Sequence, residues 1–292
     1  MKLDLKTLST VEIQNYLQHA IAPRPICFAS TIDKERNVNL SPFSFFNMFS
    51  SNPPIVIFSP ARRVRNNTTK HTLQNLQEVP EVVINIVDYS MVQQVSLASC
   101  EYPKEINEFL KSGFTAEKAQ KVKPPMVKES KIKLECLVKE IKPLGTEGGA
   151  GNLIICEVIF MHIDDSILDE NKKIDQKKIH HIARLGGDWY AKIDESNLFT
   201  VRKPNTQLGI GIDALPSFIR NSEILTGNNL GQLANVHLKP EIDPNFKNES
   251  CNEIHSTALA ENKLKQLHLL AKELLENNHV NEAWQILLSA EN

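Results

Sequence analysis

The sequence lacks the features that mark membrane-spanning, secreted and nucleic-acid-binding proteins. It contains no run of about 18 apolar residues, so we expect no helix that spans a membrane. Residues 1–10 are charged and hold no apolar segment of the kind that a secretion signal needs. Its 33 basic residues face 35 acidic ones, a net charge of −2. Without an excess of positive charge, neither nucleic acid nor a membrane is an expected partner.

Cysteine and glycine are also sparse. The five cysteines are odd in number, widely spaced and without a C-x-x-C pair, which disfavours a disulfide framework or a zinc site. We therefore expect reduced, mostly buried thiols in a cytoplasmic protein. Eleven glycines in 292 residues exclude a collagen-like or linker-rich chain. A hydrophobic content of 41% is typical of a globular protein of one large or two small domains.

Short apolar segments separated by turn residues predict a mainly β protein over the first two thirds of the chain. Strands are predicted over residues 26–32, 38–40, 55–58, 82–87, 132–141 and 153–163, and helices over 11–19, 69–79, 91–100 and 103–110. Residues 42–48 are predicted to form a loop. Because the strands follow one another with few helices between them, the pattern favours an antiparallel barrel with helical insertions over a doubly wound parallel sheet.

The composition changes after Tyr190. Residues 198–238 are rich in Asn, Gly and Pro and show little periodicity, and residues 241–256 are predicted to be a polar linker. Residues 258–276 and 280–288 carry apolar side chains at helical spacing, which predicts a C-terminal helical hairpin. Such a hairpin is either a packing appendage or a partner-binding module.

A basic segment follows the predicted strand at residues 55–58. It leads into a helix, and its cationic side chains are Arg62, Arg63, Arg65, Lys70 and His71. The N-terminus of a helix offers free N–H groups and the positive end of a dipole. Arginine, lysine and threonine side chains there would complete a phosphate site. The alternative is a solvated basic loop with threonine caps.

Two further segments mix small polar groups with aromatic rings. Residues 39–47 interleave serine and asparagine with three phenylalanines, as a planar heteroaromatic ligand requires. Residues 184–190 place two glycines before Trp189 and Tyr190, which could stack on a ring. An aromatic corner of the core and a turn that leads to a buried aromatic pair are the alternatives.

Familiar catalytic motifs are missing from the chain. There is no P-loop and no G-x-S-x-G sequence. The glycine-rich residues 148–151 join two predicted strands and not a strand to a helix, so they do not meet the dinucleotide-binding pattern. The histidines and aspartates between residues 162 and 181 match no standard ligand spacing, and we expect no metal.

Taken in chain order, several segments resemble the flavin reductase-like family with an FMN-binding split barrel, to which flavoredoxin-type proteins belong. The segments that carry the resemblance include Ala22-Pro-Arg-Pro25, Ala29-Ser-Thr31, Asn39-Leu-Ser-Pro-Phe-Ser-Phe-Phe-Asn47, Pro53-Pro54, Lys70-His-Thr72, Gly151-Asn-Leu153 and Arg184-Leu-Gly-Gly187. The resemblance covers roughly residues 10–195. Departures from it include His71, which stands where the family often has aspartate.

The resemblance implies a six-stranded antiparallel Greek-key split barrel over residues 1–195 and an extension over residues 196–292. It also implies a homodimer with FMN near the subunit interface. The residues expected to contact the cofactor are Ser30, Thr31, Asn39, Ser41, Ser44, Phe45, Phe46, Asn47, Arg62, Lys70, Thr72 and Arg184. Among these, Arg62, Lys70 and Thr72 would lie on the phosphate side.

The activity implied by the resemblance is that of an FMN-dependent NAD(P)H oxidoreductase in which hydride passes to N5 of the flavin. The cofactor carries the redox chemistry, so no catalytic acid or base is required. An FMN-binding electron carrier that serves an acceptor protein is the second hypothesis. A structural or interaction module with a vestigial flavin site is the third.

Overall fold

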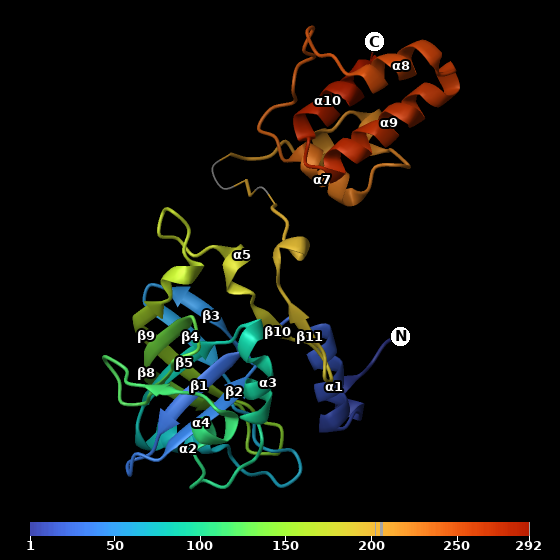
Figure 1. Ribbon diagram of the computed structural model, residues 1–292. Helices are drawn as coiled ribbons and strands as arrows, with labels where there is room; N and C mark the ends of the chain where they lie inside the picture. Colours follow the sequence, from blue (N-terminus) through green and yellow to red (C-terminus); the bar gives the residue numbers. More distant parts are fainter. Residues whose placement is uncertain (202, 205–206, 292) are drawn as a thin grey trace. The chain divides into compact units, whose positions relative to one another are not determined.

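The computed structural model describes residues 1–201, 203–204 and 207–291, apart from the side chains of residues 260 and 261. The chain divides into two compact units, Met1–Phe199 and Thr200–Asn292 (Figure 1). This division lies close to the boundary that was predicted after residue 195.

The first unit is built on one antiparallel sheet with the strand order β2-β1-β5-β8-β9-β4-β3. Its strands are β1 Cys27–Ile32, β2 Val38–Phe43, β3 Phe46–Ser51, β4 Pro54–Phe58, β5 Glu81–Ile86, β8 Ile132–Pro143 and β9 Asn152–Ile163. The prediction of a mainly β protein is confirmed.

The sheet has seven strands and not the six that the resemblance implied. The additional strand is β3, which begins within the segment predicted to be a loop, and β2 also extends into that segment as far as Phe43. Residues Phe46 to Ser51 pair with β4, and the register shifts between Met48 and Ser50. Pairing with β4 satisfies the β3 backbone, although Asn47, Ser50 and Ser51 give the segment little apolar alternation.

The outer strands of this order, β2 and β3, are separated in the chain by only Ser44 and Phe45. Three peptide steps span at most about 11 Å. The sheet must therefore curl until its two edges meet at this corner, as a barrel with one open seam does. The backbone N–H of Ser59, just after β4, donates to the carbonyl of Phe45 (2.9 Å) and fixes the corner to the end of that strand.

Helices cover the curled sheet on its outside and at one end (Figure 1). The helices of the first unit are α1 Thr10–Ala20, α2 His71–Glu78, α3 Val92–Leu97, α4 Glu108–Ser112 and α5 Gln176–Ile179, with 3-10 turns Leu5–Thr7, Tyr89–Met91, Asp165–Ile167 and Glu195–Asn197. Two short ribbons pair β6 Ala116–Glu117 with β7 Met126–Val127 and β10 Ile182–Arg184 with β11 Tyr190–Lys192.

Strand β1 is buried on both faces, which explains its lack of charged residues and the burial of its two polar residues, Ser30 and Thr31. Cys27 and Ala29 belong to the core inside the barrel, which Leu73 and Leu76 of α2 also join. On the opposite face, Phe28 packs into a second core that includes side chains from α3 and α4.

The prediction of mostly buried thiols is confirmed. Cys27, Cys136 and Cys156 lie in the barrel core, Cys251 is buried in the second unit, and Cys100 is exposed. Burial raises the pKa of the Cys156 thiol to about 12, and it raises the pKa values of Cys27 and Cys136 as well. The three core thiols are therefore protonated and inert at neutral pH.

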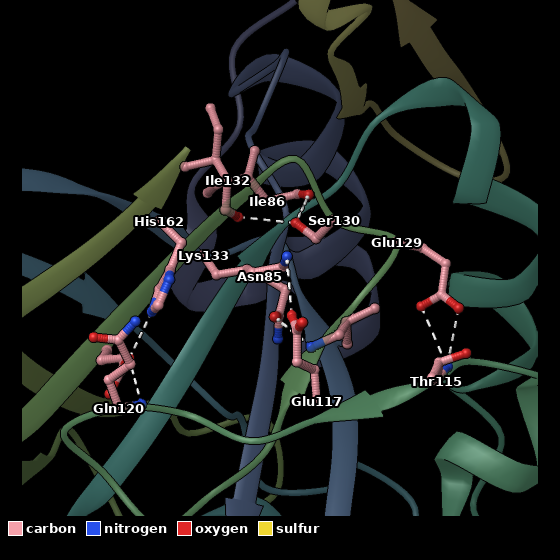
Figure 2. A network of polar contacts seen from close by, with 12 residues as sticks. Asn85, Ile86, Thr115, Glu117, Gln120, Glu129, Ser130, Ile132, Lys133 and His162 are labelled. Carbon is pink, nitrogen blue, oxygen red and sulfur yellow. Dashed lines mark hydrogen bonds and ion pairs between the residues drawn. The ribbon is translucent and has the colours of Figure 1, made fainter. Parts of the chain in front are cut away.

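The connection between α4 and β8 is fixed to the sheet by polar contacts (Figure 2). Asn85 accepts a hydrogen bond from the backbone of Val127 (2.8 Å), and Ser130 Oγ lies 2.8 Å from the carbonyls of Ile86 and Ile132. This segment lacks long regular elements, so these contacts replace a hydrogen-bond ladder.

Glu135 is the fully buried carboxylate of this region. It accepts hydrogen bonds from the backbone N–H groups of Gln120 (2.9 Å), Lys121 (2.5 Å) and Val122 (3.0 Å), and it lies 2.6 Å from His162 Nε2. Figure 2 labels Gln120 and His162 of this group. Burial alone would raise the pKa of Glu135, but these hydrogen bonds outweigh it and leave the pKa below 4.5.

The second unit is helical. It contains α6 Ser217–Arg220, α7 Gly227–Ala234, α8 Glu249–Thr257, α9 Ala260–Glu276 and α10 Val280–Leu288, with 3-10 turns Ile212–Ala214 and Ser289–Glu291. Its core is centred on Trp284, whose indole N–H donates to the carbonyl of Leu233 (3.1 Å).

The predicted polar linker over residues 241–256 is wrong at its C-terminal end, where α8 forms. Asn248 caps this helix by accepting from Cys251 N. The helix buries Cys251 and packs Ile254 against the same core. Two apolar residues in a polar stretch were too weak a pattern to predict it.

No helix in the described part of the chain is long and apolar enough to cross a membrane.

Replacement of Glu135 by glutamine is expected to lower the free energy of unfolding by about 1–3 kcal/mol at pH 7, because the buried network loses its negative charge and one of its two acceptor oxygens. The folded-state pKa is depressed, so the contribution of Glu135 is complete above pH 4.5 and is lost as the pH falls through the folded-state value. Urea unfolding at pH 7 and at pH 3 should show that the difference between wild type and variant shrinks in acid.

Glu129→Gln is the matched control, since exposed Glu129 also accepts from a backbone N–H, that of Thr115 (3.0 Å). It should change stability little. A deficit in Glu135→Gln that is equal at both pH values would contradict the assigned role of the carboxylate.

Candidate functional site

A buried arginine connects three segments around the β2–β3 corner. Arg24 is only 7% exposed, and its guanidinium donates to the carbonyls of Gln18 (2.6 Å), Ile21 and Leu185 (2.9 Å). Its Nε lies 3.5 Å from Ser44 Oγ. These contacts fix the end of α1 and the turn after β10 to the corner. Sequence reasoning missed Arg24 as a site residue, although a charged residue between two prolines was a visible signal.

The positive charge of Arg24 is not balanced by an acid. Among the described residues it forms no ion pair, and all its acceptors are carbonyl or hydroxyl oxygens. Burial lowers its pKa, and the nearby charge of Arg184 lowers it further. The corner therefore carries an uncompensated positive potential.

A pocket of about 650 Å³ opens beside this arginine. Its walls come from the start of β1, the corner residues Pro42 to Ser44, the segment from Tyr89 to Ser99, and the ribbon β10–β11. Of the predicted site residues, Ser44 and Arg184 line it.

The predicted phosphate side lies at the N-terminus of α2. This helix begins at His71, and Lys70, in the capping position, forms no side-chain capping hydrogen bond. Capping side chains normally satisfy the first N–H groups of a helix, so this end is suited to an external anion.

The arginines before α2 shape the loop. Arg62 Nε donates to Asn67 Oδ1 (2.6 Å), and Arg63 donates to the carbonyl of Thr69 (2.6 Å) while its Nε pairs with Glu101 (3.0 Å). Arg62 therefore stabilises the loop through Asn67 in this structure, and it is also a candidate contact for a phosphate.

Burial and neighbouring positive charges lower the pKa values of Lys70 and His71 at this end of α2. Burial lowers the pKa of both Lys70 and His71, and the charge of Arg63 lowers both further. Lys104 adds to the effect at His71, while Glu101 opposes it at Lys70. A bound anion would relieve this repulsion.

Thr31, Asn39 and Thr72 lie in buried hydrogen bonds. Thr72 Oγ1 donates to Asn39 Oδ1 (2.6 Å), and Asn39 Nδ2 donates to Glu108 Oε1 (2.7 Å). Thr31 accepts from Asn75 of α2 (3.2 Å). Because Thr72 has committed its proton to Asn39, it cannot donate to a phosphate in this arrangement.

Glu108 was not predicted as part of this network. It also accepts from the backbone N–H of Leu40 (3.1 Å), and burial raises its pKa. It belongs to α4, so the network joins β2, α2 and α4. Nearly seventy residues separate Asn39 from Glu108, so no local pattern predicts their hydrogen bond.

The remaining predicted residues lie on β2, at the corner and on β3. Ser41 is half-buried, Phe45 is 42% exposed, and Phe46 packs against the barrel core. Asn47 is exposed, and its side chain accepts from Met48 N (2.8 Å).

Three buried polar atoms near these elements have no hydrogen-bond partner within the described residues: Ser30 Oγ, Ser59 Oγ and Asn75 Oδ1. Ser59 follows β4 at the start of the basic loop, and a Cβ built on Gly151 would lie 2.6 Å from its hydroxyl. A side chain at Gly151 would thus obstruct this hydroxyl. With the uncapped α2 and the apolar corner, these free groups suit a phosphorylated planar ligand.

The sequence matches the flavin reductase like domain over residues 19–179, more than half of the chain. The protein belongs to the flavin reductase-like family. An uncharacterized protein of Aquifex aeolicus is 37% identical over 172 residues, which cover 59% of this chain and 85% of that protein. One from Halalkalibacterium halodurans is 34% identical over 206 residues, which cover 70% and 97%.

Solved structures of the family share the fold. Nitrilotriacetate monooxygenase component B from Bacillus cereus has a TM-score of 0.64 at 28% identity and covers 69% of this chain and 98% of that chain. A Shewanella frigidimarina protein described as a flavin reductase with a split barrel domain has a TM-score of 0.59 at 25% identity, with coverages of 70% and 99%. The curled sheet is thus a split barrel.

Replacement of Arg24 by methionine is expected to lower the free energy of unfolding by about 2–3 kcal/mol, because hydrogen bonds from a buried cation to three carbonyls are lost. It should also speed proteolysis of α1, whose C-terminal end the guanidinium holds. Urea unfolding and limited digestion followed by mass spectrometry measure the two effects. Arg65→Met, at an exposed arginine, is the control, and equal behaviour of the two variants would contradict the anchoring role.

Proposed function

We propose that this family member is an FMN-binding oxidoreductase that uses NAD(P)H as hydride donor. The observation that carries the proposal is the uncapped N-terminus of α2, which stands among Arg63, Lys70 and His71 and follows the corner of the barrel in the chain. A phosphate needs such a cationic helix end, and a flavin ring needs an apolar edge beside it.

The residues of the chain have separable roles in this proposal. Lys70, His71 and the first N–H groups of α2 would hold the phosphate. The corner segment from Ser41 to Asn47 would contact the ring, with Phe45 and Phe46 excluding water from one side. Bound FMN would supply the hydride- and electron-accepting chemistry.

A homodimer with the cofactor near its interface accompanies this proposal. Edge strand β3 leaves Met48 and Phe49 65% and 63% exposed, beside the half-exposed Phe45. Helix α1 is amphipathic and buries none of its residues. A second copy that covered these apolar groups would also shield a ring bound at the corner.

An FMN-binding electron carrier for an acceptor protein is the second candidate. It is favoured by exposed leucines on the helical unit, Leu238, Leu259 and Leu269, which could contact a protein partner.

Lys70→Ala is expected to weaken FMN binding by about 10- to 100-fold, the loss of one charge-assisted contact to the phosphate. Quenching of FMN fluorescence on titration with the protein measures the dissociation constant. Lys272→Ala is the control, since this lysine lies on α9 and pairs only with Glu276 (4.0 Å) among the described residues. Equal affinities of the two variants would refute the phosphate site.

The FMN-loaded protein is expected to lose its absorbance near 450 nm when NADH or NADPH is added without oxygen, because reduction removes the band of the oxidised flavin. Stopped-flow absorbance without a second protein measures the rate. A yellow protein that neither nucleotide bleaches would contradict the oxidoreductase and favour the carrier.

A further inference from the structure

The ribbon β10–β11 presents a chemically distinctive face to the pocket. Its register places Arg184 opposite Tyr190 and Ile182 opposite Lys192. Since alternate residues of a strand share a face, these four side chains point to the same side, and all four line the pocket. The face thus combines two cations with an aromatic ring and an aliphatic side chain.

Each cation of this face lies against a tyrosine ring. The guanidinium of Arg184 is 4.6 Å from the ring centre of Tyr190, and Lys192 Nζ is 4.7 Å from that of Tyr89. These contacts hold the long side chains in place and reduce the entropy that a ligand would have to overcome.

The opposite wall is aliphatic with hydroxyl groups at its edge. Val92 and Val95 of α3 and Ile26 form its apolar part, and Ser96 and Ser99 add hydroxyl groups, of which that of Ser99 donates to the carbonyl of Ser96 (2.6 Å). A flat ring fits between an aliphatic wall and aromatic side chains, and the hydroxyls can bind its polar substituents.

The balance of charge favours an anion. Arg184 and Lys192 line the pocket with a single acid, Asp188. The buried Arg24 forms a backbone bridge with Arg184 and has no acidic partner among the described residues. Lys192 is partly neutralised by Asp194, 3.6 Å away. Among the described residues, the Arg184 side chain donates only a long hydrogen bond, to the carbonyl of Trp189 (3.3 Å), so its planar fork is available to a carboxylate.

We propose that this pocket binds a planar aromatic carboxylate, with the carboxylate on Arg184 and Lys192 and the ring between the tyrosines and the α3 wall. A volume of about 650 Å³ lies within the range of small-molecule sites, about 300–1,000 Å³. The two phosphate charges of NADH could also pair with Arg184 and Lys192, so a nicotinamide dinucleotide is the competing ligand.

The position of this ligand beside the flavin rests on the proposed function, since Ser44 belongs both to the pocket and to the corner that would contact the ring. Binding of the carboxylate itself does not depend on the cofactor. The experiment therefore uses the flavin-free full-length protein, and a parallel FMN titration reports separately on the proposed function.

Isothermal titration with 2-naphthoate and its neutral analogue 2-naphthamide tests the pocket. We expect naphthoate to bind at least tenfold more tightly than naphthamide. Arg184→Gln and Lys192→Gln should each remove most of this preference, and Lys177→Gln, which alters an exposed lysine outside the pocket, should leave it unchanged. Asp188→Asn should tighten naphthoate binding severalfold, a gain that misfolding cannot produce.

Equal affinities for naphthoate and naphthamide would overturn the proposal, as would an Arg184→Gln variant with unchanged preference. The proposal would also fail if naphthoate did not bind while NADH bound with a dependence on Arg184 and Lys192. In that case the pocket would be the dinucleotide site.

Discussion

The structure depends on one constraint, the two-residue connection between the outer strands of a seven-stranded sheet. Because only Ser44 and Phe45 separate β2 from β3, the sheet has to curl and its edges have to meet. The same corner contacts both candidate binding regions. Ser44 borders the pocket, and the carbonyl of Phe45 binds the N–H of Ser59, where the basic loop begins. The fold thus brings both candidate binding regions to the barrel seam.

Closely spaced positive charge distinguishes these two regions from the rest of a chain whose net charge is −2, although Glu101 pairs with Arg63 before α2. Arg24 is buried without an acid, and α2 begins among cations without a cap. Like charges repel and buried charges lose solvation, and at Arg24 the hydrogen bonds to carbonyls offset this cost. An anionic ligand would relieve the remaining repulsion, so the two regions are interpreted as binding sites in addition to the structural role of Arg24.

The sequence predicted the elements in which most apolar residues are contiguous. It did not predict elements and contacts that depend on pairing with distant parts of the chain. Strands β1, β5 and β9 are apolar runs, and all were predicted. β3 was missed because it contains several polar side chains. Its backbone hydrogen bonds are made with β4, a pairing that the local sequence pattern does not show. Asn39 and Thr72 were predicted to contact the cofactor. Their burial could not be foreseen, because Asn39 is distant in the chain from Thr72 and from Glu108, to which it is hydrogen-bonded. Arg184 and Lys192 face the pocket because β10 pairs with β11 in the observed register. The sequence of two such short strands does not predict this pairing.

The central claim, that the N-terminus of α2 holds the phosphate of a flavin at the barrel seam, is tested most directly by a crystal structure of the full chain with FMN. The account predicts the phosphate within hydrogen-bond distance of Lys70 Nζ and of the first N–H groups of α2, with the ring against Ser44 and Phe45. A flavin whose phosphate lay elsewhere, with this helix end unoccupied, would contradict it.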